Sequence, residues 1–157
     1  MDTLIQFHRK HGALLDEYEE GGLPISYGSR LDEEIQTLLV GAGIFEASSC
    51  LLITVRGSDA LEFLQGMVTS NVKTLEPGQM QASLLCSNRG KIQHRVEIIR
   101  LADEQWIVSC APGEGILVGR TFDSFHIRED MELGVLNQKK IRIEIIGPES
   151  AQVLQSL

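Results

Sequence analysis

The sequence predicts an α+β protein built on a ferredoxin-like antiparallel sheet with helices. Two observations support this prediction. An apolar, β-branched run at 51–56 meets a glycine and is followed by residues at helical spacing, which indicates a strand leading into a helix. Two further apolar runs, 80–86 and 91–100, flank a Ser-Asn-Arg-Gly segment that is typical of a hairpin loop. Strand, helix and hairpin in this order make half of a ferredoxin-like unit.

The turn at Gly57 leads into the central helix. A glycine after an apolar strand usually marks a positive φ or a close backbone approach. Asp59 has Glu62 three residues later, so we expect these two side chains to form a capping box. The apolar residues that follow repeat at helical spacing and define one broad face. They are Ala60, Leu61, Phe63, Leu64, Met67 and Val68.

The other helices and strands are predicted in the same way, from helical spacing and from apolar runs. Before the central strand, residues 3–20 and 31–40 have helical patterns, which end at the glycine-containing segments 21–24 and 41–43. After the hairpin, apolar runs and helical spacing predict three strands and two helices. The strands are expected at 105–110, 133–136 and 141–146, and the helices at 114–128 and from 148 onward.

The strand-to-helix pattern occurs twice. Residues 53–60 align with 143–150, and in both segments an apolar strand meets a glycine, then an acidic first turn and a helix. The helices also match, with Leu64-Gln65 against Leu154-Gln155. Two interpretations stay open at this point. One is an internal duplication, and the other is the general similarity of strand-to-helix turns.

Composition and charge narrow the class of protein. The chain has 157 residues, enough for one domain that buries roughly 70% of the surface exposed by its unfolded chain. The formal net charge of −8 argues against a general nucleic-acid binder. Acidic residues crowd the first 34 positions, whereas basic residues lie in the later strands. These basic residues are either an electropositive face for an anionic ligand or scattered solvated charges.

The three cysteines, Cys50, Cys86 and Cys110, form no CxxC pair. The sequence therefore supports neither a zinc site nor a disulfide framework, and reduced thiols indicate a cytoplasmic compartment. The N-terminus has no signal-peptide pattern. The longest apolar stretch, 38–45, is far too short to span a bilayer.

Two other motifs contain residue types that are common in binding sites, but their spacing and surroundings do not support a site. His8 and His11 are three residues apart, but no third ligand is evident nearby, so we expect no metal site. Glycines at 113, 115 and 119 have the wrong spacing for a dinucleotide-binding turn, and no Walker lysine follows them. We expect these glycines to introduce a helix instead.

Short motifs along almost the whole chain resemble a known family. They include Gly57-Ser58-Asp59-Ala60, Phe63-Leu64-Gln65, Val68-Thr69-Ser70-Asn71-Val72, Gly90-Lys91-Ile92 and Gly147-Pro148-Glu149. Their order and spacing together resemble the folate-binding superfamily of the glycine-cleavage T-protein, an aminomethyltransferase, and the YgfZ-like proteins. The resemblance covers only the N-terminal half of such a protein, and no single motif decides it.

The resemblance implies a domain division and a ligand. Residues 1–50 and 139–157 would be parts of a first T-protein-like domain, which the absent C-terminal half completes, and 51–138 would be the ferredoxin-like domain. In this family tetrahydrofolate lies in a central cavity between domains, so we expect tetrahydrofolate or a folate derivative as cofactor. The YgfZ-like branch has a role in iron–sulfur enzyme maintenance or tRNA modification, and carries a KGCYxGQE-type motif beyond the present sequence. We expect a small-molecule folate and a protein as partners, but neither DNA nor a membrane.

The departures from the family concern the reacting residues. The T-protein has a tyrosine on the strand after its Gly-Gln, where this chain has Ala82. It then has a Gly-Gly-x-x-Asp-Asp run in which the aspartate acts beside the pterin, and here His94 and Arg95 replace both acids. Arg95 is always positively charged and cannot steady cationic nitrogen chemistry as a carboxylate does. We therefore expect folate binding without aminomethyl transfer.

The candidate site residues each have two interpretations. His94 shares a strand face with apolar residues; it is either a base in place of the acid or a core histidine held by a backbone carbonyl or water. Cys110 matches a ligand-side asparagine of the T-protein or is a buried thiol. The resemblance assigns cofactor binding to Ala82, Leu84, His94, Arg95 and Cys110, and catalysis, if any, to His94.

Two alternatives to the folate-binding, non-transferring protein remain. One is an active one-carbon transferase in which His94 substitutes for the acid, and the other is an interaction module that has lost folate. A further hypothesis concerns Arg89, Lys91 and Arg95, which are basic residues close together in the sequence. They would attract the negatively charged glutamate tail of a folate.

Overall fold

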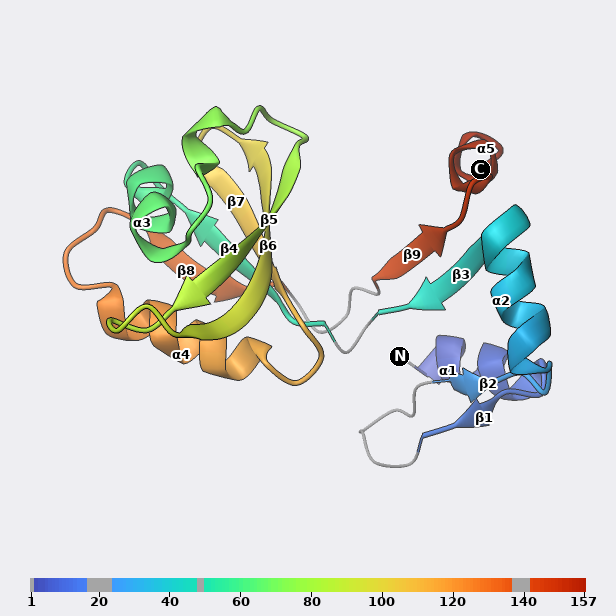
Figure 1. Ribbon diagram of the computed structural model, residues 1–157. Helices are drawn as coiled ribbons and strands as arrows, with labels where there is room; N and C mark the ends of the chain where they lie inside the picture. The colour runs from blue at the N-terminus through green and yellow to red at the C-terminus, as the bar shows by residue number, and fades with distance from the viewer. Residues whose placement is uncertain (1, 17–23, 48–49, 137–141) are drawn as a thin grey trace. The chain divides into compact units, whose positions relative to one another are not determined.

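The computed structural model describes residues 2–16, 24–47, 50–136 and 142–157 (Figure 1). The chain forms two compact units. Unit 1 comprises Met1–Ala47 with Ile141–Leu157, and unit 2 comprises Ser48–Lys140. None of the helices in the described ranges is long and apolar enough to cross a membrane.

Unit 2 is a five-stranded antiparallel sheet with the order β5-β6-β7-β4-β8. The strands are β4 (Leu52–Arg56), β5 (Met80–Cys86), β6 (Ile92–Ala102), β7 (Gln105–Cys110) and β8 (Glu132–Val135), and the helices are α3 (Ala60–Met67), η1 (Val72–Thr74) and α4 (Gly115–Phe125). The predicted α+β class is confirmed. The chain order β-α-β-β-β-α-β has one strand more than a ferredoxin-like unit, because β5, β6 and β7 form a three-stranded meander.

The core of unit 2 lies between the sheet and its two helices. Phe63 of α3 and Phe122 of α4 are buried and meet edge to face, with ring centroids 5.7 Å apart. The sheet supplies alternate residues to the same core, such as Ile53 and Val55 of β4. Burying one such side chain stabilises the fold by about 1.5–3 kcal/mol, so these positions hold the helices on the sheet.

The turn between β4 and α3 is held by a backbone contact. Gly57 has φ +134°, and a Cβ at this position would lie 2.3 Å from the Asp130 carbonyl oxygen, which explains the glycine. The predicted capping box is wrong. The Asp59 carboxylate instead accepts the backbone N–H of Asp130 at 2.8 Å, and Glu62 pairs with Lys73 at 2.6 Å. The segment before β8 thus supplies the N–H group that the Asp59 carboxylate would otherwise accept from the first turn of α3.

The described residues of unit 1 form two small antiparallel sheets and three helices. The sheets pair β1 (Leu14–Leu15) with β2 (Pro24–Ser26) and β3 (Gly43–Glu46) with β9 (Ile143–Ile146). The helices are α1 (Asp2–Lys10), α2 (Leu31–Val40) and α5 (Ser150–Gln155). The helix predicted at 3–20 ends at Lys10, because Gly12 turns the chain with φ +78° into β1. The rest of that prediction, 17–20, and most of its stop lie outside the described residues.

The two aligned strand-to-helix segments have the same backbone arrangement. Gly147 after β9 has φ +125°, and a Cβ there would lie 2.3 Å from the Gly41 carbonyl oxygen, as at Gly57. Each segment also pairs with a neighbouring strand through an equivalent backbone hydrogen bond. The Leu52 carbonyl accepts the N–H of Leu136 at 2.8 Å, and the Arg142 carbonyl accepts that of Ala47 at 2.9 Å. Thus β9 with β3 repeats the arrangement of β4 with β8.

The close approach at Gly57 predicts a large stability difference between two glycines. Gly57→Ala should lower the free energy of unfolding by roughly 2–4 kcal/mol, since the methyl group meets backbone at a φ that L-residues avoid. Gly66→Ala in α3 meets nothing within 4 Å and should be neutral or stabilising by about 1 kcal/mol. Denaturant unfolding followed by fluorescence of Trp106, the single tryptophan, measures both. Equal effects of the two substitutions would contradict this assignment.

Candidate functional site

A histidine–carboxylate pair lies where β6 meets the start of α4. His94 is on the helix-facing side of β6, two residues before the buried Val96. Its Nδ1 lies 2.9 Å from Oε2 of Glu114, the residue that precedes the first turn of α4. The His94 side chain is 13% exposed and that of Glu114 is 39% exposed. The Nδ1 atom of His94 is therefore held by a carboxylate.

This pair has the parts of a proton-transfer site. When Nδ1–H donates to the Glu114 carboxylate, the imidazole lone pair lies on Nε2. The carboxylate also stabilises the imidazolium if Nε2 takes up a proton. A histidine oriented in this way can act as a general base or acid toward a group that reaches Nε2. The sequence indicated His94, but Glu114 lies 20 residues away and has no local motif that connects it to His94.

Cys110 belongs to the same face of the sheet. It is buried at the end of β7 and pairs in register with Val96, which shares the face of His94. Burial raises the pKa of the Cys110 thiol to about 11, and the negative charges of Glu114 and of a Cys50 thiolate act in the same direction. Such a pKa keeps the Cys110 thiol mainly protonated at neutral pH, and the protonated thiol is a poor nucleophile.

The other candidate binding residues lie on the opposite face of the sheet. Leu84 pairs in register with Arg95, whereas its neighbour Leu85 pairs with His94. Directly opposed residues in an antiparallel pair point to the same side, so Ala82, Leu84 and Arg95 share one face and His94 lies on the other. The Arg95 side chain is 72% exposed. The structure brings His94 and Cys110 together but separates them from the other three candidates.

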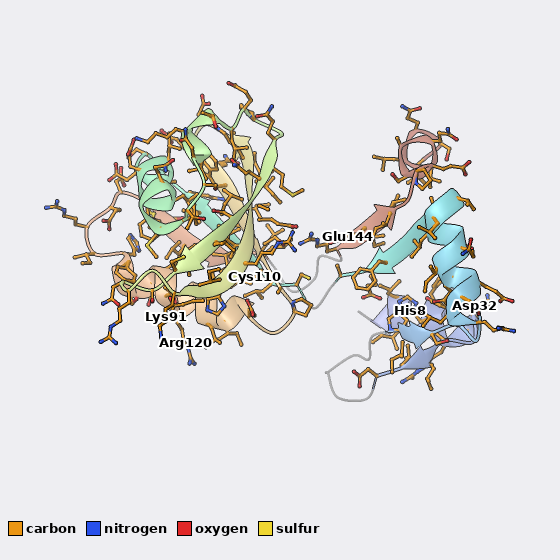
Figure 2. All side chains as sticks on the ribbon, in the orientation of Figure 1. His8, Asp32, Lys91, Cys110, Arg120 and Glu144 are labelled. Carbon is orange, nitrogen blue, oxygen red and sulfur yellow. The ribbon has the colours of Figure 1, made fainter. Side chains whose placement is uncertain are left out.

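The basic residues near the hairpin are exposed. Arg89 lies in the turn between β5 and β6. Lys91, which Figure 2 labels, follows that turn. With Arg95 they place three positive charges on neighbouring positions of the same hairpin. Such charges attract an anionic group without fixing its orientation.

A second histidine cluster, which the sequence did not indicate, lies in unit 1. His8 of α1 is only 6% exposed, and its Nε2 lies 2.6 Å from a Glu46 oxygen in β3. Its Nδ1 bonds to the hydroxyl of Tyr27. Burial and the charge of Glu46 raise the pKa of Tyr27, which keeps this hydroxyl protonated. The partners are 19 and 38 residues away in the sequence, so no local pattern connects them.

His11 does not join the cluster around His8, since its Nδ1 donates to the Phe7 carbonyl at 2.8 Å. Within the described part of the chain, no group of three or more His, Cys, Asp or Glu side chains could hold a metal ion. The buried His8–Glu46 pair instead connects α1 to β3, because a buried carboxylate needs such a partner.

Comparisons with a protein-family model and with individual proteins agree with each other. Residues 4–157 match the family described as the GCVT N-terminal domain. An aminomethyltransferase of a Geobacillus species is 29% identical over 156 residues, covering 98% of this chain and 42% of that protein. The Streptomyces coelicolor aminomethyltransferase is 28% identical and is covered to 40%. The chain thus spans about two-fifths of the length of these relatives.

A solved structure agrees in fold. The crystal structure of the glycine cleavage system aminomethyltransferase T from Bartonella henselae matches with a TM-score of 0.87. The match covers 98% of this chain and 42% of that protein, at 24% identity. At that identity the likeness establishes the fold and not the activity.

The raised pKa of Cys110 predicts how its reactivity changes with pH. At pH 8, a thiol with a pKa of about 11 carries about a hundredfold less thiolate than one with the ordinary value of 9.0. Alkylation of Cys110 by iodoacetamide should therefore be slow at pH 8 and rise toward pH 11. Glu114→Gln should speed it, because removing the carboxylate charge lowers the pKa. Peptide mass spectrometry measures each cysteine separately, with Cys86 as the internal control; alkylation of Cys110 as fast as that of Cys86 at pH 8 would contradict the assignment.

Proposed function

Because the chain belongs to the family of the GCVT N-terminal domain, we propose that it binds tetrahydrofolate or a folate derivative without transferring an aminomethyl group. The family resemblance and the aminomethyltransferase relatives support the folate part of this proposal. The presence of His94 and Arg95, where the resemblance expects two acids, supports the absence of aminomethyl transfer. Because the chain spans only about two-fifths of those relatives, the activity of the whole protein is itself a proposal.

One observation supports the absence of aminomethyl transfer most strongly. The resemblance drawn from the sequence implies that the T-protein has two acids at the positions of His94 and Arg95. Arg95 lies exposed on the other face of the sheet and supplies no carboxylate to this site. A cationic aminomethyl nitrogen is stabilised by an adjacent carboxylate. The carboxylate beside His94, that of Glu114, is already paired with the imidazole at 2.9 Å, which supports the absence of aminomethyl transfer.

The cellular role that we propose follows from the YgfZ-like resemblance. It is maintenance of iron–sulfur enzymes or modification of tRNA in the cytoplasm, with a protein as a further partner. Folate would serve here as a bound ligand rather than as an aminomethyl acceptor. The division of the chain into parts of a first domain (1–50 and 139–157) and a ferredoxin-like domain (51–138) belongs to the same proposal.

The His94–Glu114 pair favours a second candidate, a one-carbon transferase that uses a histidine base. Glu114 orients the imidazole so that Nε2 can accept a proton from a folate nitrogen when an aminomethyl or formyl group is transferred. Loss of turnover in His94→Ala with folate affinity retained would identify this case. The sequence also proposes Ala82, Leu84, Arg95 and Cys110 as folate contacts. Cys110 shares the sheet face of His94, whereas Ala82, Leu84 and Arg95 lie on the other face, so a folate bound at His94 would contact Cys110 but not these three directly.

Calorimetric titration with tetrahydrofolate and its formyl derivative tests the proposal. We expect saturable binding, together with no tetrahydrofolate-dependent release of ammonia from an aminomethylated lipoyl carrier. Turnover would contradict the absence of transfer, and its loss in His94→Ala would establish the histidine-base candidate. No binding of either folate would contradict the folate proposal and favour an interaction module.

The exposed basic residues predict how this binding depends on salt. In Lys91→Gln/Arg95→Gln, the affinity for tetrahydrofolate should fall about tenfold at low salt, because two charges that attract the glutamate tail are lost. The dependence of affinity on ionic strength should flatten as well. Arg56→Gln, which removes an exposed charge at the far end of β4, is the matched control. Unchanged affinity in the double variant would assign these residues to the solvated surface.

A further inference from the structure

The hydrogen bond between His94 and Glu114 determines which ring nitrogen of the histidine can bind a ligand. An ionised carboxylate has only acceptor atoms, so the His94 Nδ1 atom, 2.9 Å from Oε2 of Glu114, carries a hydrogen and donates it. In a neutral imidazole the other nitrogen, Nε2, then has a lone pair and no hydrogen. Among the described residues, none forms a hydrogen bond with Nε2. This atom therefore presents a single acceptor to a ligand.

A single acceptor selects among the nitrogen atoms of a reduced folate. The pyrimidine edge of the pterin presents two adjacent donors, N3–H and the 2-amino group, and this pair matches the two oxygens of a carboxylate. One imidazole nitrogen instead matches an isolated N–H group, and tetrahydrofolate has such groups at N5 and N8. Of these two, N5 differs between folate forms, because 5-formyl- and 5-methyltetrahydrofolate have no hydrogen on it.

The basic residues of the hairpin indicate which isolated N–H group faces His94. Lys91, labelled in Figure 2, is exposed just before β6 and lies three residues from His94, which is about 10 Å along an extended strand. The aminobenzoyl group that separates the glutamate tail of a folate from ring carbon C6 has a similar length. With the tail at Lys91, the ring atoms nearest His94 are C6 and its neighbour N5, whereas N8 is farther away.

We propose that Nε2 of His94 accepts a hydrogen bond from N5–H of the bound folate, so that the site prefers folates with an unsubstituted N5. This inference rests on the proposed folate binding and adds the form of folate that is bound. Glu114 is a positioning residue, because it fixes the tautomer of His94 without contacting the ligand. An acceptor that a ligand covers without bonding to it costs affinity, so the site discriminates against a folate that lacks N5–H.

Calorimetric titration with two ligands of nearly equal shape tests the proposal. Tetrahydrofolate has an N5–H group, and 5-deazatetrahydrofolate has a CH₂ group of similar size in its place. At about pH 8, where an ordinary imidazole is neutral, tetrahydrofolate should bind about tenfold more tightly than the deaza analogue. Because the two ligands fill the same space, this ratio measures the hydrogen bond rather than a steric clash.

Three variants test whether the preference comes from the His94–Glu114 pair. In His94→Leu the two ligands should bind with equal affinity, because the acceptor is removed. In Glu114→Gln the affinity ratio should fall to about twofold, because the amide can donate to Nδ1 and leave the hydrogen of His94 on Nε2. Glu62→Gln is the matched control and should keep the wild-type ratio, since the Glu62 carboxylate pairs with Lys73 at 2.6 Å instead. Far-ultraviolet circular dichroism establishes that each variant is folded.

The outcomes separate this inference from the proposed function. If neither ligand binds, folate binding itself is contradicted, and the inference falls with it. If the wild-type chain binds both ligands equally well, the inference alone is overturned and folate binding stands. A tenfold ratio that persists in folded His94→Leu would also overturn it, because N5–H would then bond to another group. An unchanged ratio in Glu114→Gln would contradict the positioning role of Glu114.

Discussion

The position of α4 on the sheet is the constraint on which the candidate site depends, and two close backbone contacts fix it. At its start, a Cβ on Gly115 would lie 2.1 Å from the Cβ of Leu51. Beyond its end, the Asp130 carbonyl occupies the space that a side chain on Gly57 would need. Glycine at both points lets the helix and its connection lie against the β4 segment. Glu114 is thereby held beside His94, 20 residues away in the sequence.

The elements with strong periodicity could be predicted from the sequence, but the contacts between distant segments could not. The predicted bounds 31–40, 80–86 and 105–110 are those of α2, β5 and β7, because long apolar patterns flanked by turn residues decide them locally. The strands β1, β2 and β3 have two to four residues, too few to show a period. Tertiary pairing defines these strands instead.

The candidate site could likewise be predicted only in part, because it depends on a contact between distant segments. Alternation along β6 places His94 toward the core, but nothing in the sequence indicates that Glu114 accepts its hydrogen bond. The resemblance motif at 68–72 is a related case. Gln65 accepts the N–H of Val72 at 3.0 Å, and Ser83 accepts that of Ser70 at 2.9 Å, so side chains outside the motif hold its backbone. Such motifs indicate a family because they stabilise its fold. They do not indicate the chemistry, which has to be argued from His94 and Arg95, the residues that replace the family's two acids.

The histidine rings offer the most direct test of a folate site in unit 2. The chain has four histidines, and only His94 belongs to the candidate site. Nuclear magnetic resonance can follow each ring during titration with tetrahydrofolate. The account predicts that His94 resonances shift and saturate with the ligand, while those of His8 in unit 1 stay unchanged. Saturated binding that leaves His94 unchanged, or that shifts His8 instead, would contradict it.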